Sequence, residues 1–373
     1  MAAPGAKITA TSTLLLTSRA ARSAAEAAPY SVAKAAPGDA RAAAPDAPIA
    51  APAPVFSIVI VSYRCLPDLL ACLQSVAAET TGDAGHLAAS QVEVIVVDND
   101  SKDHTAETLH SAPQATRFLE MPANCGFAAA VNTGVRFSSG RYILLLNPDA
   151  QLLPGCLREL ADRLDRDKSI GIAGARVINP DGSLQLPCRR ALPSPLASVI
   201  ALLGLPQLFP GHFVPYELPV PADWRDPRLH APRPPREPEP VGAVSGAAMV
   251  IRREVLADVG YLDDGFFIFG EDLDYCFRAG NAGWRVVSIP HAFVVHKRGV
   301  SRGARPIASI RAGHDAMARY FRKHLLRRRS RFAGALVLAA IRLRQEALVM
   351  LARRRLARQD RSAAPRFSES DRA

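Results

Sequence analysis

The stretch VEVIVVDNDS (residues 92–101) passes from a run of branched apolar residues directly into a polar cluster. Such a run, with almost no polar alternation, is typical of a strand buried on both faces of a sheet. Similar runs are FSIVIV (56–61) and YILLL (142–146), and a shorter one spans 116–121. Segments with helical spacing lie among them, at 67–76, 103–110 and 127–137. This alternation predicts an α/β fold with an open, mostly parallel, doubly wound sheet and helices on both faces.

The second half of the chain resumes the pattern after an interruption. We expect strands at 170–178, 241–251, 285–289 and 293–296, and helices at 253–259, from about 271, and at 309–326. Residues 204–240 hold eleven prolines, which excludes a sheet or a long helix there. We predict a surface insertion, with a mobile flap over a substrate site as the alternative.

Composition divides the chain into a leader, a body and a tail. Residues 1–54 are mostly Ala, Pro and small polar residues, which bury too little surface to offset the entropy of ordering. We therefore expect a disordered leader, with an organellar transit peptide as the alternative. The body spans 55–325, with halves at 55–180 and 241–325 on either side of the insertion. Residues 326–373 form a basic, helical, amphipathic tail.

The net charge of +11 is a property of the tail. Residues 302–373 carry a balance of +14, whereas residues 1–301 carry −3. A basic tail suits anionic membrane surfaces as well as nucleic acid. Because an apolar run at 332–341 lies between arginine clusters, we expect peripheral membrane contact through 327–358 and no nucleic-acid partner. A helix docked on the body or on a protein partner is the alternative.

The six cysteines are scattered, with no CxxC pair and no zinc-like spacing. They are typical of reduced, mostly buried thiols. We therefore expect a cytoplasmic protein, peripheral on the cytoplasmic face of the membrane.

Polar residues follow three of the predicted strands. Tyr63 ends the first, Asp98 and Asn99 the second, and Asn147 and Asp149 the fourth. Because ligands of parallel sheets bind beyond the carboxyl ends of the strands, we predict a binding cleft there. In it, Asn99 would hydrogen-bond a nucleotide base and Tyr63 would stack on that base or line its pocket. Asp149 lies where a diphosphate would need a divalent cation as a bridge, although a plain turn after Pro148 is an equal alternative.

The segment GEDLDYCFR (270–278) predicts an acidic helix start. From about Glu271, residues Glu271, Asp274 and Arg278 fall on one face and can pair, which leaves Asp272 free. Apolar neighbours and carboxylates would raise its pKa, as a base for a hydroxyl requires. A capping role at the helix N-terminus is an equal alternative.

His296 ends the last predicted strand. A lone histidine is more often a structural residue than a ligand. A position opposite Asp149 would nevertheless let it share a divalent cation, with Mn²⁺ favoured somewhat over Mg²⁺.

These motifs occur in an order that resembles the family 2 glycosyltransferases, and in particular a rhamnosyltransferase-like branch. The resemblance covers about residues 56–301 and is carried by five segments. They are VSYRCLPDLLACLQSV, VVDNDSKDHT, NCGFAAAVNTGV, LLLNPDA, and GYLDDGFFIFGEDLDYCFRAGNAGWRV with PHAFVVHKRGVS.

The resemblance implies a GT-A fold, a nucleotide-sugar donor, a divalent cation (Mn²⁺ or Mg²⁺) and transfer with inversion. Residues 55–180 would then bind the nucleotide, and 241–325 the acceptor. By position in the motifs, the nucleotide-binding residues are Val61, Tyr63, Asp98, Asn99, Gly126 and Asn132. Asp149 and His296 match metal ligands, Asp272 matches the catalytic base, and Asn147 replaces the first carboxylate of the family's DxD motif.

We therefore predict an inverting glycosyltransferase that acts on a carbohydrate or lipid-linked acceptor in surface polysaccharide or glycolipid synthesis. Subgroup resemblance suggests L-rhamnose from dTDP-rhamnose. The alternative is a non-catalytic nucleotide-binding adaptor that acts through the basic tail. A dinucleotide oxidoreductase is excluded, because no GxGxxG follows the first strand.

Overall fold

A computed structural model describes residues 33–34, 53–81, 87–110, 117–193, 237–297, 306–326 and 331–363. Most of the predicted leader, most of the Pro-rich insertion and the arginine cluster at 327–330 lie outside these residues. Within them, no helix is apolar over a stretch long enough to cross a bilayer. All six cysteines are described and are free thiols, as predicted.

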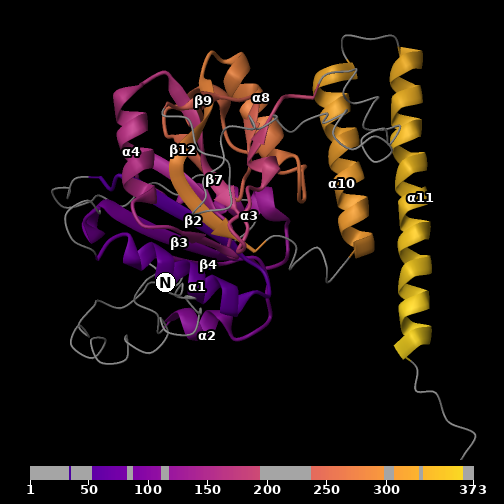
Figure 1. Cartoon of the computed structure of the whole chain (residues 1–373), viewed down its shortest axis with the longest axis horizontal. Helices are drawn as coiled ribbons and strands as arrows, with labels where there is room; N and C mark the ends of the chain where they lie inside the picture. The colour runs from indigo at the N-terminus through magenta and orange to yellow at the C-terminus, as the bar shows by residue number, and fades with distance from the viewer. Residues whose placement is uncertain are drawn as a thin grey trace, which may run out of the picture.

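The first half of the body is the predicted parallel α/β unit (Figure 1). Its strands are β2 (Phe56–Ser62), β3 (Val92–Asp98), β4 (Arg117–Glu120) and β5 (Tyr142–Leu146), in the order β4-β3-β2-β5. Its helices are α1 (Leu66–Ala78), α2 (Thr105–His110) and α3 (Phe127–Arg136), with a short turn η1 (Ala89–Gln91) before β3. All pairs among these strands are parallel, so their carboxyl ends meet at one edge.

The second half makes the sheet mixed, because β11 (Ala248–Arg252) inserts antiparallel between β5 and β7 (Ile170–Ile178). Next to β7 lies β12 (Arg285–His296), parallel to it, and then β6 (Ala150–Leu152), antiparallel. The short β9 (Glu239–Pro240) pairs with β12. The helices of this half are α4 (Cys156–Arg166), α7 (Val255–Val259) and α8 (Glu271–Asn281). The predicted start of the acidic helix at Glu271 is confirmed.

Two strand predictions for this half are wrong in detail. The segment 241–251 is not one strand, because a turn at 245–247 separates β10 (Ala243–Val244) from β11. Strand β10 pairs with β8 (Arg189–Arg190), which follows a short turn η2 (Leu186–Cys188). Conversely, the two strands expected at 285–289 and 293–296 are one strand, β12, because a bulge accommodates Pro290 without ending the pairing.

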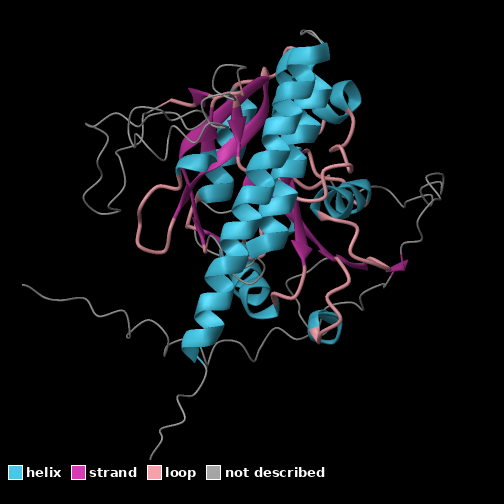
Figure 2. Ribbon diagram, turned by 90° about the vertical axis from the view of Figure 1, so that its right-hand side faces the viewer, coloured by secondary structure: helices cyan, strands magenta, loops and turns pink. Residues whose placement is uncertain are grey.

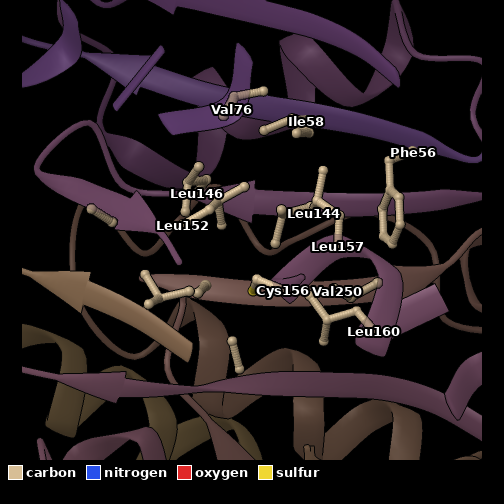
Figure 3. Packing of buried hydrophobic residues seen from close by; sticks show 14 of the residues in the cluster. Phe56, Ile58, Val76, Leu144, Leu146, Leu152, Cys156, Leu157, Leu160 and Val250 are labelled. Atoms are coloured by element: carbon tan, nitrogen blue, oxygen red, sulfur yellow. The ribbon is translucent and has the colours of Figure 1, made fainter. Parts of the chain in front are cut away.

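The central strands are buried on both faces, as their composition predicts. Alternate residues of β2 and β5 enter two separate cores, with Ile58 and Leu144 on one side and Val59 and Ile143 on the other. Figure 3 shows the first core, where Leu157 from α4 lies close to the strand residues. Helices α1 and α4 cover this face, and α3 and α8 cover the other.

The edge beside β4 carries a strand that composition does not predict. Residues Ala33 and Lys34 of the leader form β1, which pairs in parallel with Leu119 and Glu120 of β4. An edge strand needs only backbone hydrogen bonds, which an Ala-rich segment supplies as well as any other.

The C-terminal part forms a helical hairpin beside the sheet (Figures 1 and 2). It consists of α10 (Pro306–Tyr320), a π-helical turn η3 (Phe321–Leu325) and α11 (Arg331–Ala363). Tyr320 and Ala316 of α10 pack on Phe266, next to α8. Arg319 and Lys323 bond Asp263 at 2.5 and 2.7 Å, and although burial opposes the effect, these bonds lower the pKa of Asp263 to about 2.

The body contains a buried helix cap that gives a test of the fold. Glu79, 3 % exposed, accepts hydrogen bonds from the amides of Gly155 (2.7 Å) and Leu157 (2.8 Å) at the start of α4. We predict that Glu79→Ala lowers the free energy of unfolding by about 1.5–3 kcal/mol, because charged hydrogen bonds are lost and buried amides lose their partner.

Urea denaturation would measure this change. Glu159→Ala is the matched control, since Glu159 pairs with Arg163 one turn along the same helix, with a quarter of its side chain exposed, and caps no amide. Such a pair should cost about 0.5 kcal/mol. Equal losses in the two variants would contradict the capping role.

Candidate active site

The polar ends of β2 and β3 meet as the sequence predicts. Ser62 lies directly opposite Asp98 in the parallel ladder, and the amide of Asn99 donates to the Ser62 carbonyl at 2.8 Å. Asp98 accepts hydrogen bonds from the amide and hydroxyl of Ser101. Burial raises the pKa of Asp98, although these hydrogen bonds oppose the shift. Asp98 therefore supports the loop after β3.

Asn99 organises a second loop at this edge. Its amide nitrogen donates to the Asn124 side chain and to the Gly126 carbonyl, both at 3.2 Å. Its oxygen accepts from the amide of Cys125 at 3.0 Å. Asn99 is 3 % exposed, so its first function is to hold the loop 124–126 over the strand ends.

Gly126 lies where no other residue fits. Its φ is +87°, and a Cβ atom there would lie 2.5 Å from the carbonyl oxygen of Phe267. That carbonyl accepts a hydrogen bond from the amide of Phe127 at 2.6 Å. The loop 124–126 is thus fastened to the segment just before α8.

The three other predicted nucleotide-binding residues lie differently from Asn99 and Gly126. The Val61 side chain packs in the core, while Tyr63 is half-buried beside the strand ends, with the Arg64 guanidinium 5.2 Å from its ring. Asn132, 3 % exposed, spends its amide on the backbone of Leu262, at 2.9 and 3.0 Å. Its place within α3 turns this amide toward the loop after α7, so Asn132 supports that loop, and its assignment to the nucleotide-binding residues stays a prediction.

Asp149 and His296 come together as predicted. The Nε2 atom of His296, at the end of β12, is 3.1 Å from Oδ1 of Asp149. It is also 3.3 Å from the side-chain nitrogen of Asn147. Asp149 lies in a tight turn in which the amide of Ala150 donates to Asn147, so the turn interpretation of Asp149 holds as well.

This pair fits part of a divalent-cation site. One carboxylate and one imidazole nitrogen are suitable ligands, and both side chains are only 12–14 % exposed. Among the residues that the structure describes, no third His, Cys, Asp or Glu joins them as a cluster. The protein would therefore supply two ligands, and diphosphate oxygens and water would have to supply the rest.

Asp272 is not the free carboxylate that helix geometry predicts. Arg190 donates to its Oδ2 at 2.7 Å, and the amide of Gly246 donates to the same atom at 3.1 Å. The amide of Leu273 bonds Oδ1 at 2.7 Å. Asp272 is thus a fixed carboxylate whose charge Arg190 balances, at 9 % exposure.

Of the two neighbouring carboxylates, Asp274 and Glu271, only Asp274 pairs as predicted. Asp274 pairs with Arg278 at 2.8 Å, as predicted, and is fully buried. Glu271 does not pair with Arg278, and its Oε2 atom is buried without a hydrogen-bond partner. Burial raises the pKa of Glu271 to about 8, and the charge of Asp272 adds to the shift. Burial therefore favours the protonated form of Glu271.

A single turn connects the two polar groups. Gly246 bonds Asp272, and the carbonyl of its neighbour Ala247 accepts from the amide of Asn147 at 3.0 Å. The Asp272 carboxylate and the Asp149–His296 pair therefore border the same region at the end of β5.

Sequence reasoning missed the partners of this site. Arg190 lies 82 residues before Asp272 and next to the insertion, and its only signal is the pair of arginines in the segment LPCRR (186–190). Gly246 is signalled only by the small residues that break the predicted strand.

The chain belongs to glycosyl transferase family 2, whose signature it matches over residues 57–260. The signature of a second family, glycosyltransferase like family 2, matches residues 236–312. The chain is a glycosyltransferase with a GT-A fold. One relative is the N-acetylglucosaminyl-diphospho-decaprenol L-rhamnosyltransferase of Mycobacterium tuberculosis, 31 % identical over 70 % of this chain and 82 % of the relative. Another is the low-salt glycan biosynthesis hexosyltransferase of Haloferax volcanii, 24 % identical over 60 % and 61 %.

Solved structures similar to the chain are more distant. GalNAc-T7 with UDP, GalNAc and Mn²⁺ has a TM-score of 0.49 at 19 % identity and covers 66 % of this chain and 44 % of that one. A mannosyltransferase from Pyrobaculum calidifontis with GDP-Man and Mn²⁺ has a TM-score of 0.45 at 17 % identity, over 84 % and 77 %. The family assignment rests on the sequence matches.

Two glycines separate steric contact from backbone strain. We predict that Gly126→Ala costs about 1–3 kcal/mol more stability than Gly155→Ala and also weakens nucleotide binding, because only Gly126 lies against Phe267. Gly155 has a similar φ, +83°, but its ψ of 2° is left-handed helical whereas that of Gly126 is 168°, and nothing lies within 4 Å of an added Cβ at Gly155. Gly155→Ala therefore reports left-handed strain without a clash, about 1–2 kcal/mol. Thermal unfolding and nucleotide titration would measure both variants, and equal behaviour would contradict the fastening of this loop.

Proposed function

We propose that the chain is an inverting glycosyltransferase that transfers a sugar from a nucleotide-diphosphate donor to an acceptor hydroxyl in cell-surface polysaccharide synthesis. The donor that we favour is dTDP-L-rhamnose, and the acceptor a lipid-linked sugar. The name of the mycobacterial relative supports both choices, since it denotes an L-rhamnosyltransferase acting on a diphospho-decaprenol-linked sugar.

One observation carries the proposal. The turn at 245–247 bonds the carboxylate of Asp272 through Gly246 and the backbone of Asn147 through Ala247. A base for the acceptor and residues suited to a cation-bound diphosphate thus border one region. Inversion requires this arrangement, because nucleophile and leaving group occupy opposite sides of the same carbon in a single displacement.

The reaction follows from these positions. Asp272 takes the proton of the acceptor hydroxyl as its oxygen forms the bond to the anomeric carbon, and the bond from that carbon to the diphosphate breaks. Three donors fix the carboxylate and still leave it lone pairs to accept this proton. Arg190 offsets the charge of Asp272 beside a dianionic leaving group.

Asp149 and His296 are the residues that would hold a divalent cation, Mn²⁺ or Mg²⁺. The cation, when bound, neutralises the charge that develops on the departing diphosphate. Burial favours the protonated form of Glu271 beside Asp272, and its Oε2 atom is buried without a hydrogen-bond partner among the described residues.

The base role can be tested with a matched pair of isosteric variants. Asp272→Asn should lower sugar transfer about 10²–10⁴-fold and leave nucleotide binding nearly unchanged, because the amide keeps the shape of the side chain but cannot take the proton. Asp264→Asn is the control, since Asp264 is exposed and its side chain forms no hydrogen bond with the residues that the structure describes. The assay is a panel of nucleotide sugars with Mn²⁺ or Mg²⁺, scored for donor hydrolysis and transfer.

Full transfer by Asp272→Asn would remove this residue from the base role. No turnover of any donor by a folded wild-type protein, together with salt-sensitive binding of polyanions by residues 302–373, would favour the non-catalytic adaptor instead.

We also propose peripheral membrane contact through α11, which carries two apolar faces. One packs on α10, where Ile341 and Val349 are buried. The other is exposed: its residues, spaced by four, seven and seven, lie within about 40° of one another at 100° per residue. They are Phe332, Leu336, Leu343 and Met350, 49–75 % exposed.

Arginines accompany this outer stripe along the helix and continue it toward the C-terminus. Arg342 lies beside it, and Arg353, Arg354, Arg355 and Arg358 follow it, against two acidic residues of α11, Glu346 and Asp360. An apolar stripe with cationic neighbours suits an anionic lipid surface better than an apolar protein groove. Contact with such a surface would bring the site to a lipid-linked acceptor.

Binding to vesicles tests this contact. Leu343→Asp should weaken binding to vesicles of phosphatidylglycerol and phosphatidylcholine at least about tenfold, because burial of one Leu contributes about 1.5–3 kcal/mol. Leu356→Asp is the matched control, on the same helix but on the opposite side from the stripe. Cosedimentation measures both, and equal binding by the two variants would exclude the stripe as the contact surface.

A further inference from the structure

The turn after β7 brings one side chain onto His296. Strand β7 ends at Ile178, which lies opposite Val295 of β12 in the parallel ladder. The chain then reverses through Asn179 and Ser183, whose backbones bond at 2.7 Å, and returns beside β7. Gln185, 6 % exposed, follows this turn and thereby lies against the end of β12.

The orientation of the Gln185 amide is determined by its partners. Its Nε2 atom donates to the backbone carbonyl of His296 at 2.7 Å, and a carbonyl can only accept. The same Nε2 donates to Oδ1 of Asn179 at 2.8 Å. Asn179 is oriented in turn, because its nitrogen donates to the Ser183 hydroxyl, which itself donates to Asp181. The oxygen of Gln185 therefore faces the His296 ring.

This orientation sets the hydrogen on the imidazole. The Oε1 atom of Gln185 is 2.9 Å from Nδ1 of His296 and can only accept, so Nδ1 carries the hydrogen. The neutral ring then has its lone pair on Nε2. That atom faces Oδ1 of Asp149 at 3.1 Å and Nδ2 of Asn147 at 3.3 Å. A lone pair and a carboxylate that face each other at this distance repel unless a cation or a hydrogen lies between them.

We propose that Gln185 is a positioning residue that fixes the tautomer of His296 and so prepares Nε2, with Asp149, to bind the divalent cation. The inference rests on the proposed function and deepens it. Gln185 contacts neither the cation nor the sugar donor, and acts through the ring of His296. Partners of this kind contribute about 10–100-fold in metal affinity.

Three variants separate this role from a merely structural one. Gln185→Met keeps the volume and removes both hydrogen bonds to His296. Asn179→Ala loosens the same turn but leaves the contact between Gln185 and His296 in place. Gln185→Glu restores an acceptor for Nδ1–H.

Two readouts on the full chain decide the question. Nitrogen NMR of the His296 ring in the presence of Mg²⁺ reports which nitrogen carries the hydrogen, and titration with Mn²⁺ alone, followed by electron paramagnetic resonance, reports affinity. We expect Nδ1–H in the wild type, an affinity about 10–100-fold lower in Gln185→Met, and nearly wild-type behaviour in Asn179→Ala. Gln185→Glu should lose less affinity than Gln185→Met, because Glu keeps the acceptor for Nδ1–H although it loses the donor to the His296 carbonyl.

Several outcomes would overturn the inference. A wild-type ring with its hydrogen on Nε2 excludes it, even if Gln185→Met does not fold. Equal losses in Gln185→Met and Asn179→Ala would mean that Gln185 only braces the turn. Wild-type affinity in Gln185→Met would refute this inference alone, whereas a wild type that binds no Mn²⁺ would count against the metal in the proposed function as well.

Discussion

The antiparallel insertion of β11 between β5 and β7 is the constraint on which the site depends. Because β11 runs against its neighbours, the turn that precedes it, at 245–247, lies at the same edge as the carboxyl end of β5. A fully parallel sheet would have put the start of this strand at the opposite edge. The turn can therefore bond both Asn147 and Asp272, and two segments more than a hundred residues apart border one region.

The features that sequence could predict are the local ones. Branched runs identify the buried strands, the polar residues that follow them identify the site edge, and the spacing of Asp274 and Arg278 identifies their ion pair. Each depends on residues within a few positions of one another. The approach of His296 to Asp149 was predicted from the placement of strand ends, and it is found.

The features that sequence could not predict depend on distant partners. Helix geometry indicates that Asp272 avoids Arg278, but it cannot show that Arg190 arrives from another segment to hold it. Likewise, the motif assigns Asn132 to nucleotide binding, but it cannot show that the backbone of Leu262 bonds both the oxygen and the nitrogen of its amide. The pKa of Glu271 is raised by burial, and burial at the start of α8 depends on distant segments that cover the helix.

The contacts of the C-terminal hairpin with Asp274 determine where the chain can be shortened without loss of stability. This carboxylate has no exposure, and besides Arg278 it is held by Lys323 and His324, both at 2.7 Å, from η3. A shortened chain that ends before η3 would leave it with one partner where it now has three. Losing a partner of a buried charge costs about 3–5 kcal/mol, and the helix affected is the one that begins with Glu271 and Asp272. The hairpin therefore stabilises the helix that carries Asp272. We expect residues 57–260, which match the family signature, to fold less stably when expressed without it.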